Sequence, residues 1–153
     1  MFYAWVDDKE KLQETLGLLN SSSTALWGRM DAQQMIEHLI VLYKMSNKKQ
    51  ETLILTPEKH LPKSLAFLMS EELLPKNFVA KFLPIDPSPY KYSSMQEAIS
   101  KLVFYLNSYH TYWKGIEEET LNHPVFGKLN KVQWDCVHNK HIQHHFLQFG
   151  LVK

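Results

Sequence analysis

Apolar residues recur along much of this chain at the period of about 3.6 residues that is typical of an amphipathic helix. Segments with this pattern predict helices over residues 8–19, 31–47, 94–116 and 130–149. The period is clearest in the third segment, where the apolar stripe consists of Ile99, Leu102, Val103, Leu106, Tyr109, Trp113 and Ile116. The pattern therefore predicts an all-α protein with four main helices.

Polar residues at the starts of three of these segments fit the capping box, in which two side chains satisfy free backbone N–H groups reciprocally. The pairs are Asp31 with Gln34, Ser94 with Glu97, and Asn130 with Gln133. A run of three serines at 21–23 ends the first segment, and Gly150 follows the last one. Helix starts are thus predicted at residues 31, 94 and 130.

Residues 48–93 separate the second and third helices and break the helical pattern. Prolines forbid one continuous helix here, and they stand at Pro57, Pro62, Pro75, Pro84, Pro87 and Pro89. A short helix over residues 62–74 fits between them, followed by an extended stretch. The segment has no apolar period long enough for a core of its own, so we interpret it as a long crossover that walls a pocket and influences substrate choice. The sequence predicts one domain, residues 1–153, folded as a four-helix bundle with this crossover between helices two and three.

Composition narrows the function classes. The chain has 153 residues, 44% of them hydrophobic and 12% aromatic, which is typical of a globular domain with a real core. Lysine and arginine (17) nearly balance aspartate and glutamate (16), so no strong basic field favours nucleic acid. Cys136 is the single cysteine, which excludes an intramolecular disulfide. We find no signal-peptide pattern and no apolar run of about 20 residues, and therefore expect a cytoplasmic protein without a membrane partner.

Half of the eight histidines, His138, His141, His144 and His145, fall within eight residues of the last predicted helix. At about 100° per residue these side chains face one sector, which Trp134 and Val137 make apolar. Buried imidazoles in such a cluster would repel one another if protonated and would leave nitrogens unpaired if neutral. A divalent metal resolves both problems, because neutral imidazole is one of its commonest ligands.

Helix geometry limits which histidines meet at one ion. His141 and His145 are neighbours at i and i+4, whereas His138 lies about 10.5 Å from His145 along the axis. His144, at i+3 from His141, is an open alternative to His145. A third ligand is then expected from another helix.

His38, in the middle of the second predicted helix, is the best candidate for this third ligand, and His110 is the second. His60 and His123 stand beside prolines in expected loops and rank lower. Gln148, one turn beyond the histidine pair, is a candidate for orienting a ligand from behind, as are His144, His138 and His110. Glu37 points about 100° away from His38, which favours a solvated role.

Two blocks of sequence resemble a known superfamily. One spans residues 27–39, from Trp27-Gly28 to His38-Leu39, and the other runs from His123-Pro124 through the His-x-x-His-His-x-x-Gln pattern to Gly150. Together they are similar to the DinB-like superfamily, in particular to an uncharacterised branch with these two blocks. The resemblance implies a four-helix bundle whose metal, commonly zinc or nickel, is held by three histidines. Those positions correspond to His38, His141 and His145, which favours His145 over His144.

Characterised members of that superfamily include transferases that attach low-molecular-weight thiols to electrophiles and a thiol-dependent isomerase, and dimers are common among them. Many relatives carry an arginine after the double histidine, where this chain has Phe146. The expected function is a metal-dependent transferase or hydrolase whose open three-histidine site activates a thiol or water against a small electrophilic substrate. The alternatives are a non-catalytic metal-binding or stress-response protein, and a metal-free helical interaction domain with pH-responsive histidines.

Overall fold

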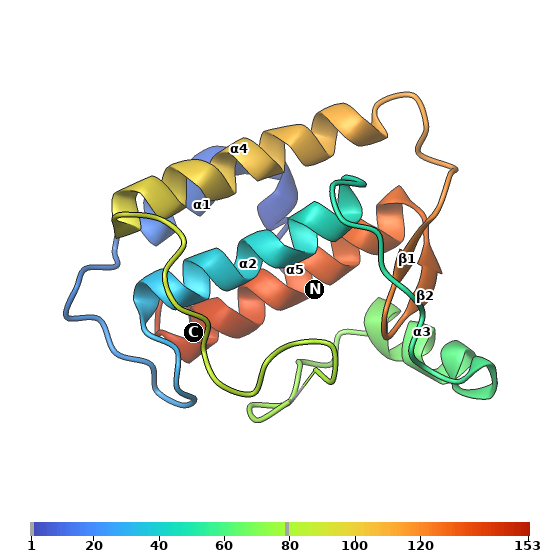
Figure 1. The fold of residues 1–153 in the computed structure, drawn as a ribbon, viewed down its shortest axis with the longest axis horizontal. Helices are drawn as coiled ribbons and strands as arrows, with labels where there is room; N and C mark the ends of the chain where they lie inside the picture. The colour runs from blue at the N-terminus through green and yellow to red at the C-terminus, as the bar shows by residue number, and fades with distance from the viewer. Residues whose placement is uncertain (1, 79) are drawn as a thin grey trace.

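The computed structural model describes residues 2–78 and 80–153 and shows a mainly helical protein (Figure 1). Its α-helices are α1 (Lys9–Leu16), α2 (Ala32–Ser46), α3 (Leu61–Met69), α4 (Met95–Trp113) and α5 (Lys131–Gln148). Short 3-10 turns, η1 (Trp5–Asp7) and η2 (Glu58–His60), precede α1 and α3. Two short strands, β1 (Leu121–His123) and β2 (Gly127–Leu129), complete the described part of the chain.

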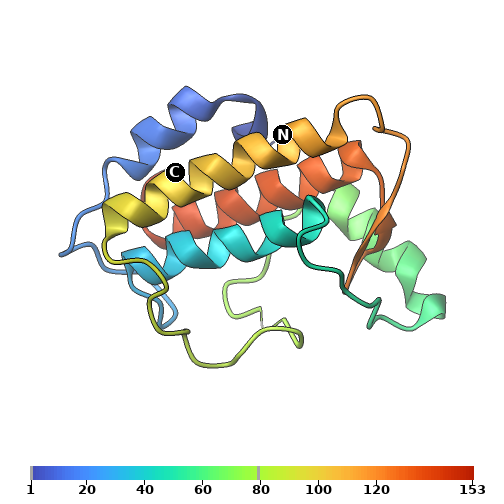
Figure 2. The same cartoon turned by 45° about the horizontal axis from the view of Figure 1, so that its top comes forward.

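The longest helices, α2, α4 and α5, run alongside one another and form the body of the molecule (Figures 1 and 2). Helix α2 packs against both α4 and α5, so it connects the two sides of the core. Helix α1 contacts α4, and η1 contacts α5. Helix α3 also packs against α5, near the strands and the start of that helix. This arrangement buries the face of α2 that looks towards α5.

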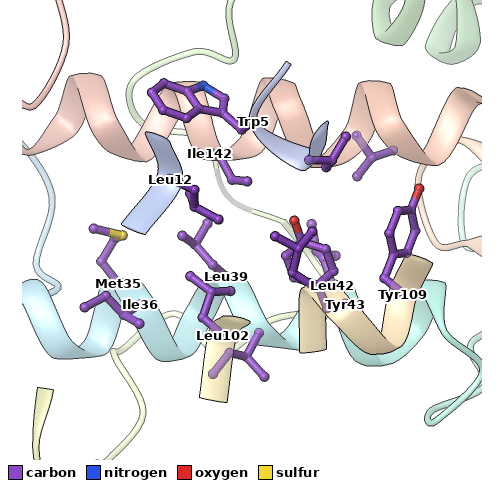
Figure 3. Close-up of a cluster of buried hydrophobic side chains, with 14 of the residues drawn as sticks. Trp5, Leu12, Met35, Ile36, Leu39, Leu42, Tyr43, Leu102, Tyr109 and Ile142 are labelled. Carbon is purple, nitrogen blue, oxygen red and sulfur yellow. The ribbon is translucent and has the colours of Figure 1, made fainter. Parts of the chain in front are cut away.

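The core lies between these helices and consists of the predicted apolar stripes together with η1. Figure 3 shows side chains from α1, α2, α4 and α5 meeting there, with Trp5 over Ile142. Leu12, Leu39 and Leu102 are at most 1% exposed. Burying each such leucine stabilises the fold by roughly 1.5–3 kcal/mol, and their burial holds α1, α2 and α4 together.

The predicted caps explain where the helices begin. Asp31 and Asn130 form complete capping boxes with Gln34 and Gln133. At α4 the box is only half formed. The Ser94 hydroxyl accepts the backbone N–H of Glu97, whereas the Glu97 carboxylate accepts from Ser93.

Two helices end earlier than the apolar pattern predicted. Helix α1 stops at Leu16 rather than residue 19, because the N–H groups of Leu18 and Leu19 bond only three residues back, to the Thr15 and Leu16 carbonyls. Helix α4 stops at Trp113 rather than residue 116, because Lys114 is extended and Gly115 has a positive φ of 83°. Side-chain periodicity continues across such turns, which is why it overestimated both lengths.

The all-α prediction is wrong in one segment. Residues 121–129 form an antiparallel hairpin in which Leu121 pairs with Leu129 and His123 with Gly127. Pro124 lies in its turn, and Gly127, which has a φ of +89°, is the first residue after the turn. Strands of three residues are too short to show a period of two, so this hairpin leaves little trace in the hydrophobic pattern.

The crossover contains α3, which is shorter than the helix predicted over residues 62–74. Beyond α3 the chain returns along the lower side of α2 and α5 (Figure 1). Hydrogen bonds fasten this return segment to α2: the Glu37 carboxylate accepts from the Lys91 N–H at 2.6 Å, and Gln33 donates to the Tyr92 carbonyl at 2.9 Å. Among the described residues, no helix is both long and apolar enough to cross a membrane.

Candidate metal centre

Three histidines from two helices meet where α2 packs on α5. The Nε2 atom of His141 lies 2.9 Å from Nε2 of His38 and 3.0 Å from Nε2 of His145. Together they form a group in which one ligand atom from each residue lies within 4.8 Å of the others. His141 and His145 are buried, and the His38 residue is partly exposed. These are the positions predicted from the sequence, and the fold brings them together.

A chain of hydrogen bonds determines which nitrogen of His145 faces the cluster. The Gln148 amide nitrogen donates to the Trp27 carbonyl at 2.9 Å, and that carbonyl only accepts. The Gln148 oxygen must therefore be the atom 2.7 Å from Nδ1 of His145, so Nδ1 carries the proton. Nε2 of the neutral ring is left with a lone pair directed at the cluster.

Gly28 makes the approach of this loop to Gln148 possible. A Cβ atom at position 28 would lie 2.6 Å from the Gln148 amide nitrogen, closer than carbon and nitrogen can approach. Gly28 also has a φ of +83°, which other residues rarely adopt. The Trp27-Gly28 pair thus has a physical role: its first residue supplies the carbonyl and its second leaves room for the amide.

The nitrogen contacts of His141 do not form a satisfactory set of hydrogen bonds. A neutral imidazole has one N–H, and Nε2 of His141 faces two other ring nitrogens at hydrogen-bond distance. A single in-plane proton or lone pair cannot serve both neighbours. One cation between the three rings would satisfy all of them. Two nitrogens on a tetrahedral zinc lie ~3.4 Å apart, given bonds of about 2.0–2.1 Å, which is close to the separations of 2.9 and 3.0 Å around His141.

The protonation state of the cluster suits a cation. Burial, with a contribution from the positive charge of neighbouring His144, lowers the pKa of His38 to about 4. Burial and the other imidazoles of the cluster lower the pKa values of His141 and His145 well below the ordinary histidine range. At neutral pH the rings are therefore uncharged, which is the form that binds metals.

A cavity of about 490 Å³ opens at the cluster, and all three histidines line it. Its inner walls are apolar side chains of α2 and α5, including Val41, Leu42 and Val137. The outer wall is the crossover, which contributes residues between Leu74 and Lys91. The prediction that the crossover walls a pocket is confirmed. Its influence on substrate choice stays a prediction.

The remaining predicted site residues lie in three different places. His144 lines the same cavity, with its ring edge against Trp27. His138 is sealed in the core, where its Nε2 is 2.8 Å from the Ser46 hydroxyl. His110 turns away from the cavity, with its Nε2 2.6 Å from the Val6 carbonyl of η1. The structure therefore brings neither His138 nor His110 to the metal centre.

Three cavity residues were missed or ranked low from the sequence. Glu37 was expected on a solvated face but lines the cavity and holds the crossover. Lys140 is buried beside His141, and its ammonium donates to the carbonyls of Phe67, Ser70 and Glu72 at the end of α3. At about 100° per residue it lies about 100° from His141, outside the sector of the four histidines, so the helical pattern gave no signal for it. His123 was assigned to a loop, yet it is 3% exposed and lines the cavity.

Comparison with known proteins gives one partial match. Residues 92–150 match a family described as a protein of unknown function, DUF1569. That stretch includes α4, the hairpin and α5, and thus His141 and His145, whereas His38 lies outside it. No curated protein and no solved structure matches the chain.

Proposed function

We propose that this protein is a metal-dependent enzyme with an open three-histidine site formed by His38, His141 and His145. The observation that carries the proposal is the convergence of three neutral imidazole nitrogens beside a cavity. The proposal includes a DinB-like four-helix bundle of α1, α2, α4 and α5 within a single domain, residues 1–153. The packing of α2 on both α4 and α5 supports that architecture.

The proposed reaction is activation of a thiol or a water for attack on a small electrophilic substrate, as in a thiol S-transferase or a hydrolase. A zinc or nickel ion at this site would leave a coordination position open and lower the pKa of a water or thiol placed there. Gln148 holds the His145 ring in one orientation, and apolar side chains of α2 and α5 form much of the cavity wall beside the site. A cavity of about 490 Å³ is in the size range of small-molecule sites.

The proposed partner is a small molecule, together with a low-molecular-weight thiol if the reaction is thiol transfer. Phe146, which replaces the arginine of many DinB-like proteins, is fully buried against Trp5 with ring centroids 4.7 Å apart. A thiol would therefore have to be recognised by other residues than in those relatives. Homodimer formation, a cytoplasmic location and the absence of nucleic-acid and membrane partners stay predictions.

The alternative is a non-catalytic metal-binding or stress-response protein. A structural zinc site usually has four protein ligands. The two candidates for a fourth ligand, His138 and His110, face the Ser46 hydroxyl and the Val6 carbonyl instead. Their placement supports an open site, and therefore the enzyme over the alternative.

Metal analysis combined with a thiol-consumption assay tests the proposal. Protein purified without a histidine tag should contain about one zinc or nickel ion per chain, and the His38→Ala variant should lose it. The metal-loaded protein should consume a cellular thiol, or hydrolyse an activated ester, faster than the variant does. Unchanged metal content in His38→Ala would refute the site. Bound metal without metal-dependent turnover of either kind would favour the non-catalytic alternative.

A further inference from the structure

His123, at the end of β1, forms part of the cavity at a distance from the metal centre. Its ring packs against Trp134, with centroids 5.3 Å apart. Trp134 precedes His141 by two turns on α5, or about 10.5 Å along the helix axis. The cavity therefore extends from the three histidines at one end to His123 at the other.

Hydrogen bonds within the hairpin fix the tautomer of His123. Its Nδ1 accepts the backbone N–H of Val125 at 3.0 Å and that of Phe126 at 3.2 Å. A nitrogen that accepts from two donors carries no proton, so the proton of the neutral ring must be on Nε2. Burial lowers the pKa of His123 to about 3, which keeps the ring neutral at physiological pH.

The surroundings of His123 are aromatic. Its ring contacts Phe82, Phe126 and Trp134. Within residues 2–78 and 80–153, no hydrogen bond reaches its Nε2. His123 lines the cavity, so a ligand that brings an acceptor to this N–H gains a hydrogen bond there.

We propose that the Nε2–H of His123 recognises an uncharged oxygen acceptor, such as a ketone, ester or amide carbonyl, on the ligand that fills this cavity. A neutral donor among aromatic rings compensates poorly for the desolvation of a carboxylate, which disfavours an anionic group. The nearby ammonium of Lys140 is already held by three backbone carbonyls. The ligand class is thus a molecule with an apolar body and a carbonyl oxygen at the His123 end.

That the ligand at His123 is the substrate rests on the proposed function. The carbonyl end would be held at His123 while the electrophilic centre lies at the three histidines, about 10 Å away along α5. His123 would then determine specificity and take no part in the chemical step. Small molecules that reach only the His123 end should still bind, which separates recognition from catalysis.

Two substitutions separate the roles of the two ring nitrogens. In His123→Asn, the amide oxygen can replace Nδ1 as the acceptor for Val125 and Phe126, but the Nε2 donor is lost. In His123→Gln, the amide nitrogen can replace the Nε2 donor, but the acceptor for the turn is lost. We therefore expect the Asn variant to keep the thermal stability and the Gln variant to keep ligand recognition.

The experiment measures binding of acetophenone and of ethylbenzene, which has a similar shape without the acceptor, by NMR titration of protein with ¹⁵N-labelled histidine. Native protein should bind acetophenone about five- to tenfold more tightly, as one hydrogen bond predicts, with a shift of the His123 Nε2 resonance. His123→Asn should abolish that preference, and His123→Gln should retain it. Benzoate should bind more weakly than acetophenone.

Several outcomes would overturn the inference: a proton on Nδ1 of His123, equal affinity for the two probes, no binding of either, or a preference for benzoate. A preference unchanged in His123→Asn would do the same. Metal content, measured on the same samples, should be equal in native protein and His123→Asn. If native protein held no metal while the carbonyl preference depended on His123, the proposed function would fail and the recognition site would stand.

Discussion

His138 and His141 lie one turn apart on α5, and their imidazole rings have different surroundings. Both residues are buried, and burial lowers both pKa values. The Nε2 of His138 meets the Ser46 hydroxyl at 2.8 Å, and its ring stacks on Tyr43 with centroids 3.9 Å apart. The Nε2 of His141 meets only other imidazole nitrogens among its described hydrogen-bond partners.

The difference lies in what the facing atom can donate or accept. The Ser46 hydroxyl donates its proton to the Tyr43 carbonyl at 3.2 Å and accepts from the Nε2–H of His138, so both groups are satisfied. A second and third imidazole together cannot do this for His141. Burial and a lowered pKa are therefore shared by a structural histidine and a candidate ligand. The partner of Nε2 distinguishes the two.

The largest expected effect comes from exchanging either ring for a methyl group. His141→Ala should lose essentially all bound metal, because two histidines on separate helices form a weak site. His138→Ala should retain the metal and instead lower the free energy of unfolding by about 2–4 kcal/mol, as expected for a buried ring that leaves a cavity. Metal analysis of both variants measures the bound ion, and urea unfolding measures the free energy of unfolding.

Equal metal loss in the two variants would contradict the assignment of His138 as structural and His141 as a ligand. Metal retention in His141→Ala would remove His141 from the site. The native protein treated with a chelator serves as the matched control, since it lacks the ion but keeps both rings.

The next effect concerns pH, with the metal removed. The pKa of His38 falls from an unfolded value of 6.5 to about 4 in the folded protein, so between these values the unfolded chain binds more protons. The free energy of unfolding should be fully present above pH 6.5 and should decline as the pH falls towards 4. His38→Gln should decline less steeply over that window. Parallel curves for the two proteins in a series of urea titrations would contradict the assignment.

A smaller effect is expected behind the metal centre. Gln148→Leu removes the acceptor for Nδ1 of His145 and leaves the ring free to turn. Metal affinity should fall about 10- to 100-fold, while saturating metal should still fill the site. Competition with a chelator of known affinity measures this. An unchanged affinity would show that packing alone orients His145.

The smallest effect is expected for His144. It lines the cavity but lies outside the group of three histidines whose nitrogens converge. His144→Ala should therefore change metal affinity by about twofold or less because, unlike Gln148, His144 has no hydrogen bond to a proposed ligand among the described residues. A loss as large as that of His141→Ala would make His144 the ligand and displace His145.

Much of the helical fold followed from local signals. Asp31 and Asn130 begin helices where their sequences predicted, because a capping box depends on residues only three positions apart. The i, i+4 spacing of His141 and His145 is local in the same way. Pairing across the hairpin depends on backbone geometry at Pro124 and Gly127, and three-residue strands carry too little pattern to reveal it.

Errors in the site concerned partners on other elements. His110 was a candidate because α4 has an apolar face, but the Val6 carbonyl of η1 lies 2.6 Å from its Nε2. His138 shares the inward sector of α5, and nothing within α5 indicates that Ser46 faces it. His123 was assigned to a loop because Pro124 follows it. Tertiary contacts decide each of these cases.

His38 and His141 are 103 residues apart in the chain, yet their rings touch. An ion shared between them would be a reversible cross-link between α2 and α5. It would close a loop of the chain that contains α3, α4 and the hairpin. Constraining so long a loop restricts the unfolded ensemble strongly, in the manner of a disulfide, although this chain has only one cysteine. Under the proposed function, loss of the ion would therefore weaken the packing of α2 on α5 and open the cavity where the three histidines line it.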